Sequence, residues 1–182
     1  MRKTLMTLLL LSLSLPALAA DYVQAAGSTL AFAGKYQGVT FSGNFPGFSA
    51  RLRFDPQQLA KATLAVDIPL ATATTRNASY DDALRGAGFF DSATFPRAQF
   101  TATKFRALGG NRYAADGMLH LHGVNKPITL TFEWTPGTNP VLFGRATVQR
   151  LDFNVGGGQW ADTQLIPNAI AVSTRVVFKP SP

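Results

Sequence analysis

Alternation of apolar and polar residues is the feature that most restricts the fold of this chain. The segment ITLTFEW (128–134) places its large apolar side chains on one side and threonine or glutamate on the other. TLAVDI (63–68) and AIAVSTRVVF (169–178) alternate in the same way. A period of two over this many residues predicts antiparallel strands that each bury one face.

Five further segments have the composition of strands, which brings the predicted number to eight. They are STLAFAGKY (28–36), TFSGNFPGFSARLRFD (40–55), RAQFTATKFRA (97–107), RYAADGMLHLH (112–122) and PVLFGRATVQR (140–150). Glycine, proline and asparagine at 109–111 and 136–140 predict hairpin turns. Pro46-Gly47 predicts a bulge or sharp bend, because proline cannot donate to a strand ladder.

One segment, residues 74–86, departs from the alternation and predicts a short helix that ends at Gly86. Eight antiparallel strands joined mostly by hairpins favour an up-and-down barrel over a sandwich, which is the competing architecture. The predicted fold class is therefore all-β: a lipocalin-like eight-stranded antiparallel β-barrel with one short helix inserted. A barrel of this strand number either fills its interior with side chains or holds one small ligand.

The first twenty residues have the pattern of a secretory signal peptide. Arg2 and Lys3 precede an apolar run that is too short to span a bilayer, and small residues follow at a cleavage position. We therefore expect a signal peptide at 1–20, a single domain at 21–182 and export to the periplasm. The chain has no cysteine, so the exported domain must be stabilised without disulfides.

Charge and motifs exclude several functional classes. The formal net charge of +7 includes Arg2 and Lys3, and the remaining basic residues are scattered singly, which does not favour nucleic-acid binding. The sequence contains no GxSxG, HExxH, Walker or CxxC motif. We expect no enzymatic activity and no cofactor.

Two small polar groups are the remaining candidates for chemistry. His120 and His122 lie two residues apart on a predicted strand, and with Asp116 they would form a metal site of a metal-dependent enzyme. The alternative interpretation is a polar strand face, with His122 entering a turn. Asp81 and Asp82 are adjacent on a short helix, so they do not face each other and are expected to be solvated.

Phenylalanine is unusually frequent, with 14 residues, and four of them crowd the segment FFDSATFPRAQF (89–100). Rigid aromatic side chains either pack a core or line a pocket for a long apolar ligand. Small residues at strand positions favour a cavity over a filled interior. These alanines are Ala31, Ala33, Ala65, Ala102, Ala114, Ala115 and Ala171.

Several ordered motifs resemble the YceI-like family. They are FFDSATFPRAQF (89–100), FDP (54–56), TTRNASYDDAL (74–84), GMLHLHGVNKPITL (117–130) and RLDFNVG (150–156). Asn154 is a departure, since the family usually has glycine there. GQWADT (158–163) is similar to the subgroup that is joined to, or encoded beside, a membrane b-type cytochrome.

The resemblance implies a periplasmic lipocalin-like barrel with an elongated apolar tunnel for a polyisoprenoid or other long-chain lipid, including isoprenoid quinones. It implies no catalytic residue, and it suggests a homodimer. The alternative function is that of a partner of a membrane b-type cytochrome in quinone handling or oxidative-stress protection. Arg51, Arg53, Arg97 and Arg145 are candidates to meet a polar headgroup. The residues expected to line the tunnel are Phe32, Tyr36, Phe41, Phe45, Phe48, Phe89, Phe90, Phe100, Leu119, Phe132 and Trp134.

Overall fold

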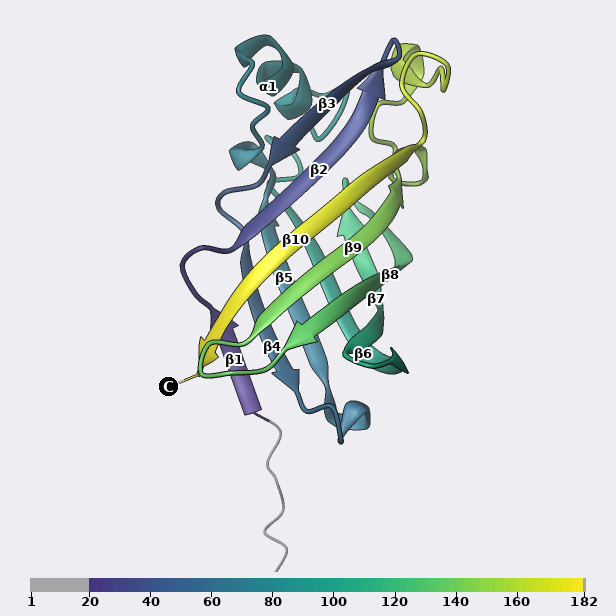
Figure 1. The fold of residues 1–182 in the computed structure, drawn as a ribbon. Helices are drawn as coiled ribbons and strands as arrows, with labels where there is room; N and C mark the ends of the chain where they lie inside the picture. The colour runs from purple at the N-terminus through teal and green to yellow at the C-terminus, as the bar shows by residue number, and fades with distance from the viewer. Residues whose placement is uncertain (1–19, 182) are drawn as a thin grey trace, which may run out of the picture.

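A computed structural model describes residues 20–181, so the predicted signal peptide lies outside the described residues except for its last position. The described chain forms ten strand segments, one α-helix and four short 3-10 helices (Figure 1). The strands are β1 (Ala20–Gln24), β2 (Thr29–Tyr36), β3 (Val39–Asn44), β4 (Ser49–Phe54), β5 (Thr63–Pro69), β6 (Arg97–Gly109), β7 (Arg112–Leu121), β8 (Val124–Thr135), β9 (Val141–Gln149) and β10 (Ala169–Pro180). The helices are α1 (Ala78–Arg85), η1 (Leu59–Lys61), η2 (Leu70–Thr72), η3 (Arg150–Phe153) and η4 (Gly158–Trp160).

The strands close into an antiparallel barrel. From β4 to β10 each strand pairs with the next one along the chain, and β1 closes the ring because it pairs with both β4 and β10. Turns at the two predicted positions join β6 to β7 and β8 to β9. Eight strands surround the interior when each of the two bent strands described next is counted once. The predicted lipocalin-like barrel is confirmed.

Two strands are bent, and each bend divides a strand into two segments. Both β1 and β2 pair with β10, at residues 178–180 and 171–175 respectively. In the same way β3 pairs with β2 and β4 pairs with β1. The break between β3 and β4 contains Pro46 and Gly47, which confirms the predicted bend. The sequence prediction missed β1, because a segment of five residues is too short for its alternation to stand out.

The inward and outward faces follow the predicted alternation. On β8 the side chains of Leu130, Phe132 and Trp134 are buried, whereas Thr131 and Glu133 are exposed. The inner face of β4 is buried in the same pattern, and β10 alternates in the same way between exposed residues and half-buried or buried ones. Because register in a sheet has a period of two, this one pattern fixes which residues can reach the barrel interior.

The two ends of the barrel are built differently. At the upper end in Figure 1, β3 is joined to the segment that follows β5 by a single bridge between Asn44 and Thr74, and α1 lies on this side. The helix confirms the prediction for 74–86, and Gly86 ends it. The lower end is formed by hairpins and by both chain ends of the described barrel. Among the described residues, no helix has the length and apolar character needed to cross a bilayer.

Candidate ligand-binding cavity

The upper half of the barrel encloses an apolar cavity of about 330 Å³. Inner-face side chains of the strands form its wall, and α1 with the loops at 86–96 and 150–168 surrounds its upper end. Tyr80 and Ala83 of α1 line the cavity and are also exposed, which places the mouth beside this helix. The volume falls in the range of about 300–1,000 Å³ that is typical of small-molecule sites.

An aromatic floor closes the lower end of the cavity; it consists of Phe54, Tyr113, Phe132, Trp134 and Phe178. The ring of Phe54 lies 5.1 Å from those of Tyr113 and Trp134 and 5.6 Å from that of Phe132, measured between centroids. All five side chains are less than 10% exposed. Edge-to-face and tilted ring pairs at these separations are favourable beyond the apolar area they bury.

Nine of the eleven predicted ligand-binding residues line the cavity. They are Phe32, Tyr36, Phe41, Phe45, Phe48, Phe89, Phe90, Phe100 and Leu119. The other two, Phe132 and Trp134, do not line it, because they lie lower on β8 and pack in the aromatic floor. The structure thus has a pocket with a mouth and a floor where a tunnel was expected, and contact of the nine residues with a ligand stays a prediction.

Sequence reasoning missed the aliphatic part of the wall, although the same alternation would have found it. These residues include Leu64, Val66, Ile128, Leu142, Val148 and Val172. The interpretation of the alanines was wrong. Ala31, Ala33, Ala65 and Ala171 alternate with inner-face residues and therefore face outward, and the buried Ala102, Ala114 and Ala115 do not line the cavity.

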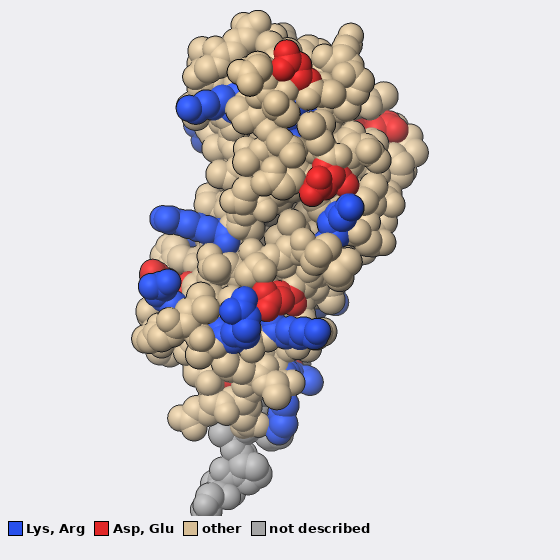
Figure 2. All heavy atoms as spheres, turned by 90° about the vertical axis from the view of Figure 1, so that its right-hand side faces the viewer, with Lys and Arg blue, Asp and Glu red and all other residues tan. Residues whose placement is uncertain are grey.

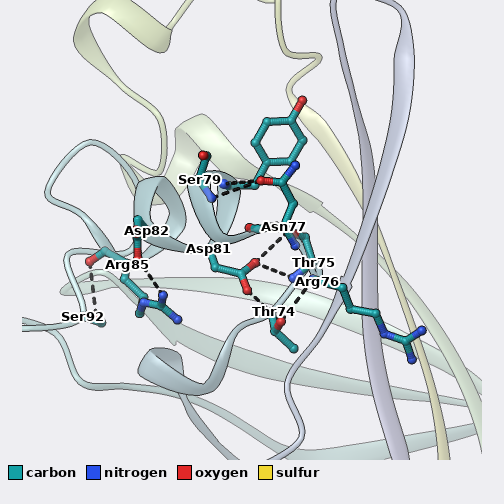
Figure 3. A network of polar contacts seen from close by, with 10 residues as sticks. Thr74, Thr75, Arg76, Asn77, Ser79, Asp81, Asp82, Arg85 and Ser92 are labelled. Atoms are coloured by element: carbon teal, nitrogen blue, oxygen red, sulfur yellow. Dashed lines mark hydrogen bonds and ion pairs between the residues drawn. The ribbon is translucent and has the colours of Figure 1, made fainter.

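A buried aspartate fastens α1 to the barrel. The carboxylate of Asp81 accepts hydrogen bonds from the backbone N–H of Thr75 at 2.6 Å, from the Thr75 hydroxyl at 2.7 Å and from the Thr74 hydroxyl at 2.8 Å (Figure 3). Thr74 in turn exchanges two backbone hydrogen bonds with Asn44 of β3. These contacts connect the first turn of the helix to the edge of the sheet.

The expectation that Asp81 is solvated was therefore wrong, since its side chain is only 9% exposed. The side chains of Asp81 and Asp82 do point in different directions, as adjacent helix positions must, but that of Asp81 points toward the barrel. The backbone N–H of Thr75, followed by its hydroxyl, holds the pKa of Asp81 below the ordinary value. Asp82 is exposed as predicted and pairs with Arg85 one turn later.

The loop at 150–168 on the other side of the mouth is organised by Arg150. This side chain is 3% exposed, and its five N–H groups donate to the backbone carbonyls of Val155, Gly156, Trp160, Ile166 and Pro167. Burial lowers the pKa of its guanidinium from the ordinary value, but arginine remains charged in proteins. Carbonyl dipoles, rather than a carboxylate, therefore stabilise this buried cation.

Asn154 lies in this loop with φ +57°, in the left-handed region that glycine and asparagine adopt most readily. Its presence in place of the family's glycine is thus compatible with the turn.

The loop at 86–96, which follows α1, contacts the loop at 150–168 beside the mouth. The N–H of Gly156 donates to the carbonyl of Gly88 at 3.0 Å, and the rings of Phe89 and Trp160 lie 5.6 Å apart. The segment 86–95, which contains the first part of the phenylalanine-rich stretch 89–100, therefore lies between the cavity and the Arg150 loop.

The histidines do not form a metal site. The Nδ1 atom of His120 lies 3.0 Å from the amide oxygen of Asn125, whereas His122 turns away with φ +50° and packs on Phe95. Asp116 bonds to Arg106 and Thr129, which together lower its pKa to about 2. Among residues 20–181 there is no group of three side chains placed to bind a metal ion.

The sequence and the fold are similar to those of known proteins. The family model for the YceI-like domain matches residues 22–178. The chain belongs to the YceI-like family. Its relatives include the UPF0312 protein of Vibrio campbellii, which is 30% identical over 91% of this chain and 96% of that protein. The UPF0312 protein of Photorhabdus laumondii is 36% identical over 73% and 72% of the two chains.

Solved structures agree with this membership. The crystal structure of Burkholderia cenocepacia BcnA superposes with a TM-score of 0.81 and 29% identity, and covers 85% of this chain and 98% of that one. A polyisoprenoid binding domain from Saccharophagus degradans has a TM-score of 0.69 over 90% and 99% of the chains. At 17% identity the second comparison shows a common fold alone.

Proposed function

We propose that this protein binds a polyisoprenoid or another long-chain lipid in the upper cavity and performs no reaction on it. The observation that carries the proposal is an apolar cavity inside a YceI-like barrel, with its mouth beside α1 and its floor made of packed aromatic rings. The Saccharophagus domain of the same fold is described as polyisoprenoid binding, which supports this ligand class.

The cavity favours a ligand that enters with its apolar tail first. Among the described residues that line the cavity, Arg150 is the one that is charged, and its five donors are already used by backbone carbonyls. A polar headgroup deep in the cavity would therefore lose its water without gaining a partner, which is costly. The headgroup would stay at the mouth, near Tyr36, Tyr80 and Trp160.

Burial of the apolar tail supplies the binding free energy. Each 100 Å² of apolar surface of the lipid tail that is removed from water contributes about 2.5 kcal/mol.

Four exposed arginines, Arg51, Arg53, Arg97 and Arg145, were predicted as candidates for headgroup contacts. Arg53 pairs with Asp21 and Arg97 with Asp67, and none of the four lines the cavity.

Analysis of the native ligand tests the proposal. The protein is purified without detergent from its own host, extracted with organic solvent and analysed by mass spectrometry. We expect one long-chain lipid per barrel. Phe100→Asp, which places a charge on the cavity wall, is expected to abolish lipid retention in a folded protein.

The matched control is Thr101→Asp, since Thr101 is the exposed neighbour on the outer face of β6. Thr101→Asp should retain the lipid of the wild type. Equal lipid content in a folded Phe100→Asp variant would contradict binding in this cavity. We also propose a periplasmic location, which the predicted signal peptide supports and which fractionation of the native host would test.

A second candidate function is quinone handling beside a membrane b-type cytochrome. It is favoured by the GQWADT segment and by the basic residues at the floor end, where Figure 2 shows Lys and Arg outnumbering Asp and Glu on the lower half of the face. The β6–β7 hairpin at this end carries the exposed Lys104, Arg106 and Arg112. A redox-active quinone in the extract would favour this function, and an isoprenoid without a quinone ring would oppose it.

A further inference from the structure

Phenylalanine and glycine alternate across the inner faces of β2 and β3. Phe32 is the register partner of Gly43, and Gly34 is the register partner of Phe41. A Cβ atom on Gly43 would lie 2.4 Å from Cζ of Phe32, and one on Gly34 would lie 2.8 Å from Cζ of Phe41. Each ring therefore lies over the glycine opposite it, against the wall of the barrel.

A third pair repeats the arrangement on the other side of the barrel. Gly117 of β7 is a diagonal neighbour of Phe100 of β6, and its Cβ would lie 2.8 Å from Cε2 and Cζ of that ring. All three phenylalanines line the cavity. Rings in contact with these three glycines occupy space next to the backbone that a side chain would otherwise fill.

An eight-stranded barrel is only just wide enough for its interior side chains. We propose that the three glycine–phenylalanine pairs set the free width of the cavity, and so the thickness of the chain it accepts; this inference rests on the proposed lipid binding. A cavity of about 150 Å³ is enough to hold one benzene molecule. A single phenyl ring displaced inward would therefore consume a large part of the 330 Å³ present.

Gly34 gives the cleanest test of the three positions. The three atoms nearest to its Cβ would all belong to side chains, those of Phe41 and of Ile170 at 2.9 Å. A Cβ on Gly43 or Gly117 would also meet backbone, namely the carbonyl oxygens of Thr74 at 2.8 Å and Thr101 at 2.5 Å. Gly34→Ala is therefore expected to displace the Phe41 ring while the strands stay paired.

The experiment measures uptake of xenon and of a C20 isoprenoid alcohol by the delipidated full domain. Gly34→Ala should lower both, with at least a tenfold loss of affinity for the alcohol. The double variant Gly34→Ala/Phe41→Ala should regain most of the xenon uptake and most of the affinity for the alcohol, because it has no Phe41 ring to displace. Ala33→Ser is the control, since it adds one atom to the same strand on its outward face, away from the cavity.

The two readouts separate this inference from the proposed function. Wild-type levels of xenon uptake and alcohol affinity in Gly34→Ala would overturn the inference, and so would a double variant that stays as poor as Gly34→Ala. Xenon uptake that falls in Gly34→Ala, in a protein whose wild type has no affinity for the alcohol, would support the glycine pairs and overturn lipid binding.

Discussion

Aromatic residues have opposite effects in the two halves of the barrel. Below, Phe54 packs against both Phe132 and Trp134, and these rings are buried in the interior. Above, Phe32 and Phe41 lie against glycines and leave the centre open. Aromatic content alone therefore decides neither a core nor a cavity. The contacts of the rings differ, with other rings below and with glycines above.

The halves also differ in what stabilises them. The floor is held by apolar packing, whereas the mouth depends on the two buried polar side chains, Asp81 and Arg150. Buried polar groups are costly when a partner is lost, so the mouth should be sensitive to changes that the floor would tolerate.

The largest expected effect is on the floor. Phe54→Ala should lower the free energy of unfolding by about 3–5 kcal/mol, because a fully packed ring leaves a cavity behind. Phe41→Ala should cost about 1–2 kcal/mol, because that ring is half-buried and already borders empty space. Chemical denaturation of both variants measures the difference, and equal costs would contradict the contrast between the halves.

The next effect concerns the loop beside the mouth. Arg150→Lys leaves three donors for five carbonyls, of which three are buried and two part-buried, and buried unsatisfied groups cost about 1–3 kcal/mol each. We expect a total loss of about 2–4 kcal/mol, faster amide exchange in the loop and faster ligand release. Arg145→Lys is the control on the outer face of β9, and similar behaviour of the two variants would argue against the role given to Arg150.

Substitutions that enlarge an interior side chain should change the free energy of unfolding in opposite directions, depending on whether the residue borders the cavity. Ala146 borders the cavity, so Ala146→Leu is expected to stabilise the empty protein by about 1–2 kcal/mol at about 0.8 kcal/mol per buried methylene, and to weaken lipid binding. Ala115 is fully buried and does not line the cavity, so Ala115→Leu should destabilise by about 1–3 kcal/mol through overpacking. Thermal unfolding with and without lipid distinguishes them, and stabilisation by both would mean that the floor is not tightly packed.

The smallest effect is the pH dependence of the helix attachment. The folded state holds the pKa of Asp81 below its ordinary value of 3.8. Its contribution to stability is therefore complete well above pH 3.8 and is lost as the pH falls through the lower, folded-state pKa. Asp81→Asn should lower Tm by several degrees at pH 7, and the gap to the wild type should narrow below about pH 4.

Asp82→Asn provides the comparison for that titration, since Asp82 is exposed on the same helix. It should match the wild type at every pH. A gap for Asp81→Asn that stayed constant down to pH 2 would show that the network does not depend on the charge of its carboxylate.

The barrel was predictable because alternation is a local property of the sequence. The pattern at 128–134 already identifies which side chains face inward. It carries no information on height along the barrel axis, so Phe132 and Trp134 were assigned to the cavity although they form its floor. The roles of Asp81 and Gly34 could not be predicted either, since each depends on a neighbour supplied by a distant segment.

The depth to which a lipid tail enters is the most direct test of the central claim. The chain has two tryptophans, Trp134 in the floor and Trp160 at the mouth, and each can be observed alone in a Trp160→Phe or Trp134→Phe variant. An isoprenoid alcohol brominated at its terminal methyl should quench the fluorescence of Trp134, and one brominated beside the hydroxyl should quench Trp160. Quenching of Trp160 by the terminal bromine, with Trp134 unaffected, would contradict tail-first binding against an aromatic floor.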